Sequence, residues 1–271
     1  MKKLILSRFV LIALVIGSPA VAADMPVKYK APLAVLAPAY SWTGFYLGGH
    51  VGGGWSRGDA DAIGQAAGIG SYSLPMSFAK GGSGLIGGAQ IGYNWQFAPS
   101  WVVGVEADAT WAHMNGSSTI SPIPPAPFFI LPAASSVTMS RTVNWLGSLR
   151  TRFGYSADRV LLYVTGGLAV GGVNHDANTI LGGLSFPASF SNTNLGWVVG
   201  GGVEYALPSD WGNWTVRGEY LYYALRDGGL AVGTNPGAVG TTTDYNWNDA
   251  SAQVVRFGLN YKFGGPVVAK Y

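Results

Sequence analysis

The chain has 271 residues and a mass of 28.3 kDa, and no obvious linker divides it into two halves, so one domain is expected. Charged residues make up only 11% of the chain, whereas aromatic residues make up 13% and glycines number 41. These proportions exclude the surface of an ordinary soluble protein and indicate that much of the surface faces an apolar environment. The chain has no cysteine, which excludes disulfides, thiolate metal sites and cysteine nucleophiles.

The excess of positive charge in the chain lies at its N-terminus. Three of the 16 lysines and arginines are Lys2, Lys3 and Arg8, and the remaining 13 cations balance 13 acids. A balanced chain has no basic footprint for nucleic acid, so no nucleic-acid partner is expected.

Residues 1–23 have the pattern of a secretory signal peptide. A positive start is followed by an apolar run over residues 9–16 and by the small residues Ala20-Val21-Ala22-Ala23. A membrane anchor needs about 20 apolar residues, and this run is much shorter. We therefore predict cleavage after Ala22 or Ala23, followed by a periplasmic lead-in over residues 24–41 that is rich in alanine and proline.

No later segment predicts a membrane-spanning helix. The most apolar candidate, residues 120–134, contains five prolines, each of which would interrupt a helix. An exported, hydrophobic chain without such helices can cross a membrane as a closed β-barrel, in which every backbone group is paired between strands.

Period-two alternation begins at Phe45 and recurs in segments of about ten residues, the length of a tilted membrane strand. One face of each segment carries apolar and aromatic residues and is predicted to meet lipid, and the other carries the polar residues and is predicted to face the lumen. A soluble sandwich is the alternative, but so many aromatics would not fit one core. Eight segments are predicted as strands: residues 45–52, 85–96, 101–111, 143–155, 160–170, 195–207, 214–223 and 253–263.

The lumen-facing positions carry charges of both signs, which are expected to form a network that closes the lumen. The turn between the sixth and seventh strands is centred between Asp210 and Trp211, which places Glu204 opposite Arg217 and predicts an ion pair between them. The predicted network has nine members: Glu106, Asp108, Arg150, Arg152, Glu204, Arg217, Glu219, Arg256 and Lys262.

The third and fourth strands are expected to pair in the same way. Glu106 and Asp108 should meet Arg150 and Arg152 inside the barrel, although the long connection between these strands leaves their register open.

The lengths of the connections alternate, as they do between the periplasmic turns and extracellular loops of outer-membrane barrels. This predicts an all-β, eight-stranded antiparallel barrel over residues 42–263 with both ends in the periplasm. Residues 264–271 are expected to be a periplasmic tail, because Gly264-Gly265-Pro266 ends a strand ladder. Three connections are short, residues 98–100, 156–159 and 208–213, and four are long, residues 56–82, 112–141, 174–193 and 224–250.

Several segments resemble one known family. They are residues 23–32 (ADMPVKYKAP), 40–49 (YSWTGFYLGG), 87–96 (GGAQIGYNWQ), 163–169 (YVTGGLA) and 255–263 (VRFGLNYKF). In order and spacing they resemble the alphaproteobacterial outer-membrane immunogenic protein family, the RopB-like, porin-family barrels. The resemblance implies an eight-stranded OmpA-like membrane domain in the outer membrane, with no catalytic residues and no cofactor. Members commonly end at the aromatic residue of the last strand, whereas eight residues follow Phe263 here.

The resemblance implies a role in envelope integrity and surface interaction, and a passive channel for small solutes is the alternative function. The expected partners are outer-membrane lipid and lipopolysaccharide, the barrel-assembly machinery, and a surface partner of the extracellular loops.

Two features leave alternatives open. His50 is expected to face the lumen, and His113 and His175 to lie where strands enter extracellular loops; a loop metal or haem site is the alternative to ordinary polar roles. The proline-rich residues 121–132 include an apolar patch at residues 128–131, which either contacts a partner or folds back on the membrane or barrel rim.

Overall fold

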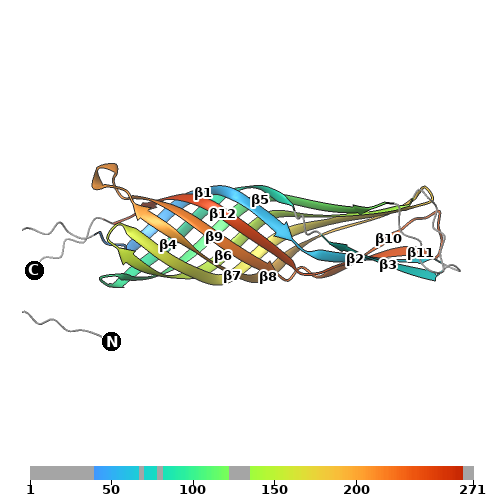
Figure 1. Cartoon of the computed structure of the whole chain (residues 1–271), viewed down its shortest axis with the longest axis horizontal. Helices are drawn as coiled ribbons and strands as arrows, with labels where there is room; N and C mark the ends of the chain where they lie inside the picture. Colours follow the sequence, from blue (N-terminus) through green and yellow to red (C-terminus); the bar gives the residue numbers. More distant parts are fainter. Residues whose placement is uncertain (1–39, 67–69, 78–81, 122–134, 265–271) are drawn as a thin grey trace, which may run out of the picture. The chain divides into compact units, whose positions relative to one another are not determined.

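Eight strands close into an antiparallel barrel in a computed structural model that describes residues 40–66, 70–77, 82–121 and 135–264 (Figure 1). Around the ring the order is β1-β12-β9-β8-β7-β6-β5-β4, so the first and last barrel strands pair and no edge is left open. The barrel strands are β1 (Gly44–Arg57), β4 (Ser83–Ala98), β5 (Trp101–Ile120), β6 (Ser136–Ala157), β7 (Val160–Leu181), β8 (Leu184–Ala206), β9 (Trp214–Leu225) and β12 (Ala250–Lys262).

Each of the eight predicted segments lies within one of these strands or extends it by a residue, and every barrel pair is antiparallel, so the predicted fold is confirmed. The short connections after β4, β6 and β8 are also as predicted. A three-residue 3-10 helix, Ser209–Trp211, lies between β8 and β9, and no helix among the described residues is long and apolar enough to cross a membrane. The expected signal peptide, residues 24–39 of the lead-in, residues 122–134 and residues 265–271 lie outside the described residues.

The regions predicted as long loops contain much regular structure, and here the sequence reading was wrong. Residues 174–193 form the outer halves of β7 and β8, which are joined through Gly182 and Gly183, both with positive φ. These outer halves are rich in Asn, Ser and Thr, so they lack the lipid-facing apolar row by which the inner halves were recognised. Their hydrogen-bonded register nevertheless continues to Leu181 and Leu184 without interruption.

Two more of the regions expected as loops, residues 56–82 and 224–250, supply a second sheet with the order β10-β11-β2-β3. Its outer strands are β10 (Gly229–Thr234) and β3 (Gly70–Ser77), and its inner strands are β11 (Thr241–Trp247) and β2 (Asp59–Ala66). This sheet shares an apolar core with the outer halves of β6 and β7. The core consists of Ala60, Ala62, Val137, Met139, Ala177, Tyr245 and Trp247, and we call it the outer core.

The exposed fractions of the side chains follow the predicted alternation. Apolar side chains on one face of the barrel strands are exposed, including Leu85 at 85%, Trp111 at 73% and Phe257 at 68%. A monomeric soluble protein rarely exposes an apolar surface of this extent. The opposite face of the same strands is buried inside the barrel.

A register shift interrupts the alternation on β6. Its buried side chains have even numbers from Leu146 to Arg152, but odd numbers from Val137 to Val143. The change coincides with bulges opposite Trp111–Met114 and at Val143–Trp145. A bulge inserts one residue into a ladder and reverses the facing of every residue beyond it.

Close contact between β1 and β12 predicts that Gly52 cannot be replaced without strain. A Cβ added at Gly52 would lie 2.1 Å from the Val255 carbonyl oxygen and 2.7 Å from the Arg256 Cα. We expect Gly52→Ala to destabilise the barrel by about 1–3 kcal/mol, the usual effect of overpacking. Urea titration in lipid vesicles, with the folded fraction read from heat-modifiable gel mobility, measures this change in the free energy of unfolding.

Gly49→Ala is the matched control. A Cβ there meets only the Gly88 carbonyl oxygen, at an ordinary distance of 3.6 Å. Equal unfolding midpoints for Gly52→Ala and Gly49→Ala would contradict the role assigned to Gly52.

Candidate functional site

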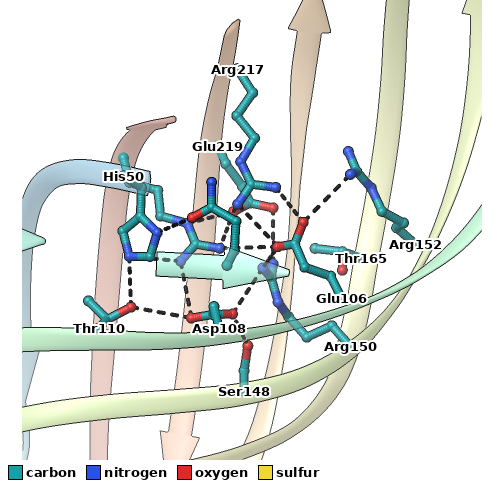
Figure 2. Close-up of polar contacts among 12 residues, drawn as sticks. His50, Glu106, Asp108, Thr110, Ser148, Arg150, Arg152, Thr165, Arg217 and Glu219 are labelled. Carbon is teal, nitrogen blue, oxygen red and sulfur yellow. Dashed lines mark hydrogen bonds and ion pairs between the residues drawn. The ribbon is translucent and has the colours of Figure 1, made fainter. Parts of the chain in front are cut away.

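Eight of the nine predicted lumen charges meet in one hydrogen-bonded cluster, which we call the lumen network. Figure 2 shows its central part, with Glu106, Asp108, Arg150, Arg152, Arg217 and Glu219 labelled. Each side chain points inward from a barrel strand, and no member is more than 8% exposed. The network holds four acids and four bases, so it is formally neutral. Its members are Glu106 and Asp108 on β5, Arg150 and Arg152 on β6, Glu204 on β8, Arg217 and Glu219 on β9, and Arg256 on β12.

Glu106 is the centre of the lumen network. Its two carboxylate oxygens accept hydrogen bonds from both terminal nitrogens of Arg217, at 2.5 and 3.1 Å. Such a forked, charge-assisted contact is among the strongest that a carboxylate makes. The Tyr46 hydroxyl donates to the same carboxylate at 2.6 Å. Three more guanidinium groups lie beside it, those of Arg150, Arg256 at 3.5 Å and Arg152 at 3.6 Å.

Several of these contacts cross the lumen. Strands β9 and β5 stand on opposite sides of the eight-strand ring, so the Arg217–Glu106 contact spans the full width of the barrel. Arg150 reaches Glu219 from β6 to β9, at 3.0 Å. An eight-stranded barrel is narrow enough for side chains of opposite walls to meet.

The predicted pairing of β5 with β6 is confirmed. Glu106 stands directly opposite Arg150 in the register, and Arg150 contacts both Glu106 and Asp108. Arg152 reaches Glu106 at 3.6 Å.

The prediction for Glu204 and Arg217 is only half right. The two residues stand directly opposite in the β8–β9 register and both point inward, as expected. The prediction of an ion pair between them is wrong, because the Arg217 side chain extends across the lumen to Glu106. Glu204 instead accepts hydrogen bonds from Thr215 at 2.5 Å, Arg152 at 2.8 Å and Asn260 at 3.0 Å.

Lys262 lies outside the lumen network, contrary to the prediction. Its ammonium group donates to the Ser41 carbonyl oxygen and lies 4.2 Å from the centre of the Tyr40 ring. It is the last residue of β12, at the short-turn end of the barrel, and its partners lie in the chain that precedes β1.

Residues of that preceding chain and of β5, β7 and β8 form an apolar lid at this end of the lumen. Trp42 is only 1% exposed, and its indole nitrogen donates to the Asp158 carbonyl oxygen at 3.1 Å. Burial raises the pKa of the neighbouring Tyr40 to about 12. Tyr40 and Ser41 are the last two residues of the predicted lead-in, and Trp42 begins the predicted barrel segment. The lid consists of Trp42, Val102, Leu161, Tyr163 and Ala206, with Tyr40 packed against it.

An apolar plug fills the lumen on the other side of the network. It includes Leu221, Tyr223 and Leu225, which continue the inward row of Arg217 and Glu219 at a period of two. The sequence carried this signal, but only the charges of the row were used in predicting the lumen. The plug consists of Ile86, Ala112, Met114, Val143, Leu146, Ala169, Val173, Val198, Leu221, Tyr223, Leu225, Ala252 and Val254.

A second polar cluster, the neck cluster, includes the buried carboxylate of Asp227, which has an exposed fraction of 0%. Arg141 and His175 contact its Oδ2 at 3.1 and 3.0 Å, and Asn194 donates to its Oδ1. The His175 ring also stacks on Phe190, with 4.4 Å between ring centres. Sequence reasoning missed this cluster because its members come from β6, β7, β8 and the segment after β9.

The three histidines therefore have different surroundings. His50 is buried in the lumen, where it hydrogen-bonds Gln90 and, at 2.9 Å, Thr110 (Figure 2). His113 is exposed on the outer part of β5, and His175 belongs to the neck cluster. Among residues 40–66, 70–77, 82–121 and 135–264, no three His, Cys, Asp or Glu side chains are grouped as metal ligands.

Comparison with known proteins agrees with this architecture. The family model described as "Outer membrane protein beta-barrel domain" matches residues 10–263. The 31 kDa outer-membrane immunogenic protein of Brucella melitensis is 34% identical over 97% of this chain and 100% of its own length. A 22 kDa outer membrane protein of Rhizobium leguminosarum is 32% identical over 74% of each chain. Among solved structures, Neisserial surface protein A aligns with a TM-score of 0.37 and 15% identity, over 82% of this chain and 98% of that one.

Proposed function

Because the chain belongs to the outer membrane protein β-barrel family and lies in the outer membrane, we propose that it is a structural and surface-interaction protein with a closed lumen. The observation that supports the proposal most strongly is the series of three packed layers along the lumen. They are the apolar lid, the lumen network and the apolar plug.

The lumen network supports closure because its charges have no alternative to pairing. Desolvating an unpaired charge is costly, so buried guanidinium and carboxylate groups remain charged only where they contact each other. Arg150 and Arg256 are 1% and 0% exposed, which leaves no water-wide passage along their side chains. A solute would have to break the Arg217–Glu106 contact to pass.

The apolar plug supports closure independently of the charges. Met114, Leu146 and Leu221 have exposed fractions of 0% and come from three different strands of the ring. An ion crossing this layer would lose its hydration without gaining polar partners. Loss of the charged contacts alone would therefore leave the lumen blocked.

The surface-interaction part of the proposal rests on the structure beyond the barrel wall. The second sheet and the outer halves of β6 and β7 share the outer core, so this region can present a defined surface. Leu230 and Val239 on it are 66% and 92% exposed, and exposed apolar residues of this kind suit a protein partner. The Brucella relatives are named immunogenic proteins, in keeping with a surface-exposed region.

No catalytic step is part of this function. His175 is the histidine with a buried carboxylate partner, but its contacts are Asp227 and the rings of Phe190 and Trp247, none of which is a nucleophile. The buried carboxylate of Asp227 instead offers a counter-charge for Arg141. Insertion by the barrel-assembly machinery remains part of the proposal, as for other outer-membrane barrels.

Single-channel recording of the refolded mature protein in planar bilayers tests the closed lumen. We expect silence or rare small flickers, because the lid, network and plug would all have to part for ions to pass. Heat-modifiable gel mobility of the same sample shows that the barrel is folded, and a heat-unfolded sample is the control for leakage. Stable openings on the order of a nanosiemens would contradict the proposal and favour a passive channel for small solutes.

A further inference from the structure

We propose that the outside of the barrel wall carries a binding site for the phosphorylated headgroup of an outer-leaflet glycolipid. The site is a cavity of about 650 Å³ at the outer ends of β1, β8, β9 and β12, which we call the wall cavity. Its lining includes the cations Arg57 and Arg226, the rings of Trp197 and Tyr222, and the acids Asp59 and Asp249.

The position of the two arginines places the wall cavity at the membrane surface. Arg57 ends the outward row of β1, which includes Val51 at 67% exposed. Arg226 directly follows β9 and continues its outward row, which includes Tyr220 at 42% exposed. With the short turns in the periplasm, both cations stand at the outer-leaflet end of lipid-facing rows. An outward arginine costs about 0–1 kcal/mol there, against about 2–4 kcal/mol at the midplane.

Neither guanidinium is used inside the protein. Arg57 and Arg226 are exposed, and neither forms a side-chain hydrogen bond or ion pair with any residue in the described part of the chain. By contrast, the four arginines of the lumen network all contact carboxylates. Two unpaired cations that line one cavity indicate an anionic ligand from outside.

The two acids of the wall cavity, Asp59 and Asp249, are exposed, but both also act on groups of the protein. Asp249 accepts a hydrogen bond from the Asp227 backbone N–H at 3.2 Å. Asp249 and Asp59 also lie close enough to the buried Arg141 to stabilise its charge. Their charges therefore oppose an external anion less than their number implies.

The side chains of the cavity fit a phosphorylated sugar headgroup. A guanidinium fork binds phosphate through two parallel hydrogen bonds. Trp197 and Tyr222, whose ring centres are 5.7 Å apart, provide an apolar wall beside it. Aromatic residues of this kind concentrate at the level of lipid headgroups, where they contact both sugar and acyl chain.

The spacing of the arginines favours a ligand with two anionic groups. Arg57 stands opposite Ser251 on β12, and Ser251 stands opposite Ala224, two residues before Arg226. The arginines are thus separated by one intervening strand, or about 10 Å across the sheet. A glycolipid with a phosphorylated disaccharide can contact both, whereas a phospholipid with one phosphate can contact only one at a time.

Native mass spectrometry of the full mature protein with added lipid tests this site. The probes are diphosphorylated lipid A, its dephosphorylated form and phosphatidylglycerol. We expect diphosphorylated lipid A to bind most tightly, and the double variant Arg57→Gln/Arg226→Gln to weaken it at least about tenfold, since two charge-assisted forks are lost. The double variant with lysine at both positions keeps the charges without the forks and should lie between.

Asp176→Asn is the control, because Asp176 is an exposed charge on the outer part of β7, away from the wall cavity. Heat-modifiable mobility shows that each variant is folded, as expected for exposed substitutions. Unchanged lipid A binding by the double glutamine variant would overturn the site. Equal, arginine-dependent binding of phosphatidylglycerol would overturn the glycolipid assignment. Both results are independent of whether the lumen conducts.

Discussion

Replacing Glu106 by glutamine is expected to destabilise the folded barrel by about 3–5 kcal/mol, the usual loss when one partner of a buried ion pair is removed. The carboxylate contacts Arg150 and Arg217 directly and has two more guanidinium groups within 3.6 Å. Glutamine has nearly the same volume but no charge, so it leaves the network with one unbalanced positive charge in a buried space. The free energy of unfolding in lipid vesicles, from urea titration, is the quantity to measure.

The double variant Glu106→Gln/Arg217→Met provides the matched control. Removing Arg217 as well restores neutrality and avoids an unpaired guanidinium, so the double variant should be more stable than Glu106→Gln alone. A double-mutant cycle with Arg217→Met gives the coupling energy between the two side chains. A loss below about 1 kcal/mol for Glu106→Gln, the level of a surface pair, would refute the central place of this carboxylate.

Replacing Asp227 by alanine is expected to unfold the second sheet locally while the barrel stays folded. Asp227 is fully buried and contacts Arg141, His175 and Asn194, so its removal takes away the carboxylate that contributes most to stabilising the Arg141 charge, ahead of Asp59 and Asp249. The cost is again about 3–5 kcal/mol, but it falls on the junction between the barrel and the second sheet. Hydrogen exchange should therefore speed up in β2 and β11 and stay slow in β9.

Asp176→Asn serves as the control for this experiment as well. Asp176 follows His175 in the chain but faces the opposite side of β7, where it is exposed, so its loss should leave the exchange of β2 and β11 unchanged. Unchanged protection of both strands in Asp227→Ala would contradict the structural role of the neck cluster. Exchange in β9 as fast as in β2 would show that the two parts unfold together.

The barrel itself could be predicted from the sequence because the membrane imposes a simple pattern. A lipid-facing row must be apolar at every second residue, and this row marks each strand of the barrel independently. The short turn between β8 and β9 also fixed the register that sets Glu204 opposite Arg217. The sequence therefore predicts which residues point inward, but not which side chains they contact.

The partners of the inward residues depend on closure of the ring, which no local pattern reports. A register predicts neighbours on one wall, but Arg217 has a side chain long enough to reach Glu106 on the opposite wall. The neck cluster has the same origin, because Arg141 and Asp227 come together only when the outer halves of the strands are folded. The second sheet escaped prediction because its strands are short and lie outside the lipid, where no apolar row marks them.

The contact across the lumen has a consequence for how this sequence can change over evolutionary time. Glu106 and Arg217 are 111 positions apart in the chain and on non-adjacent strands, yet each is the other's main counter-charge. A change of sign or size at either position is tolerated only with a compensating change at the other. Homologous sequences should therefore show correlated substitution between these distant sites, whereas directly opposed neighbours such as Glu204 and Arg217 should vary independently.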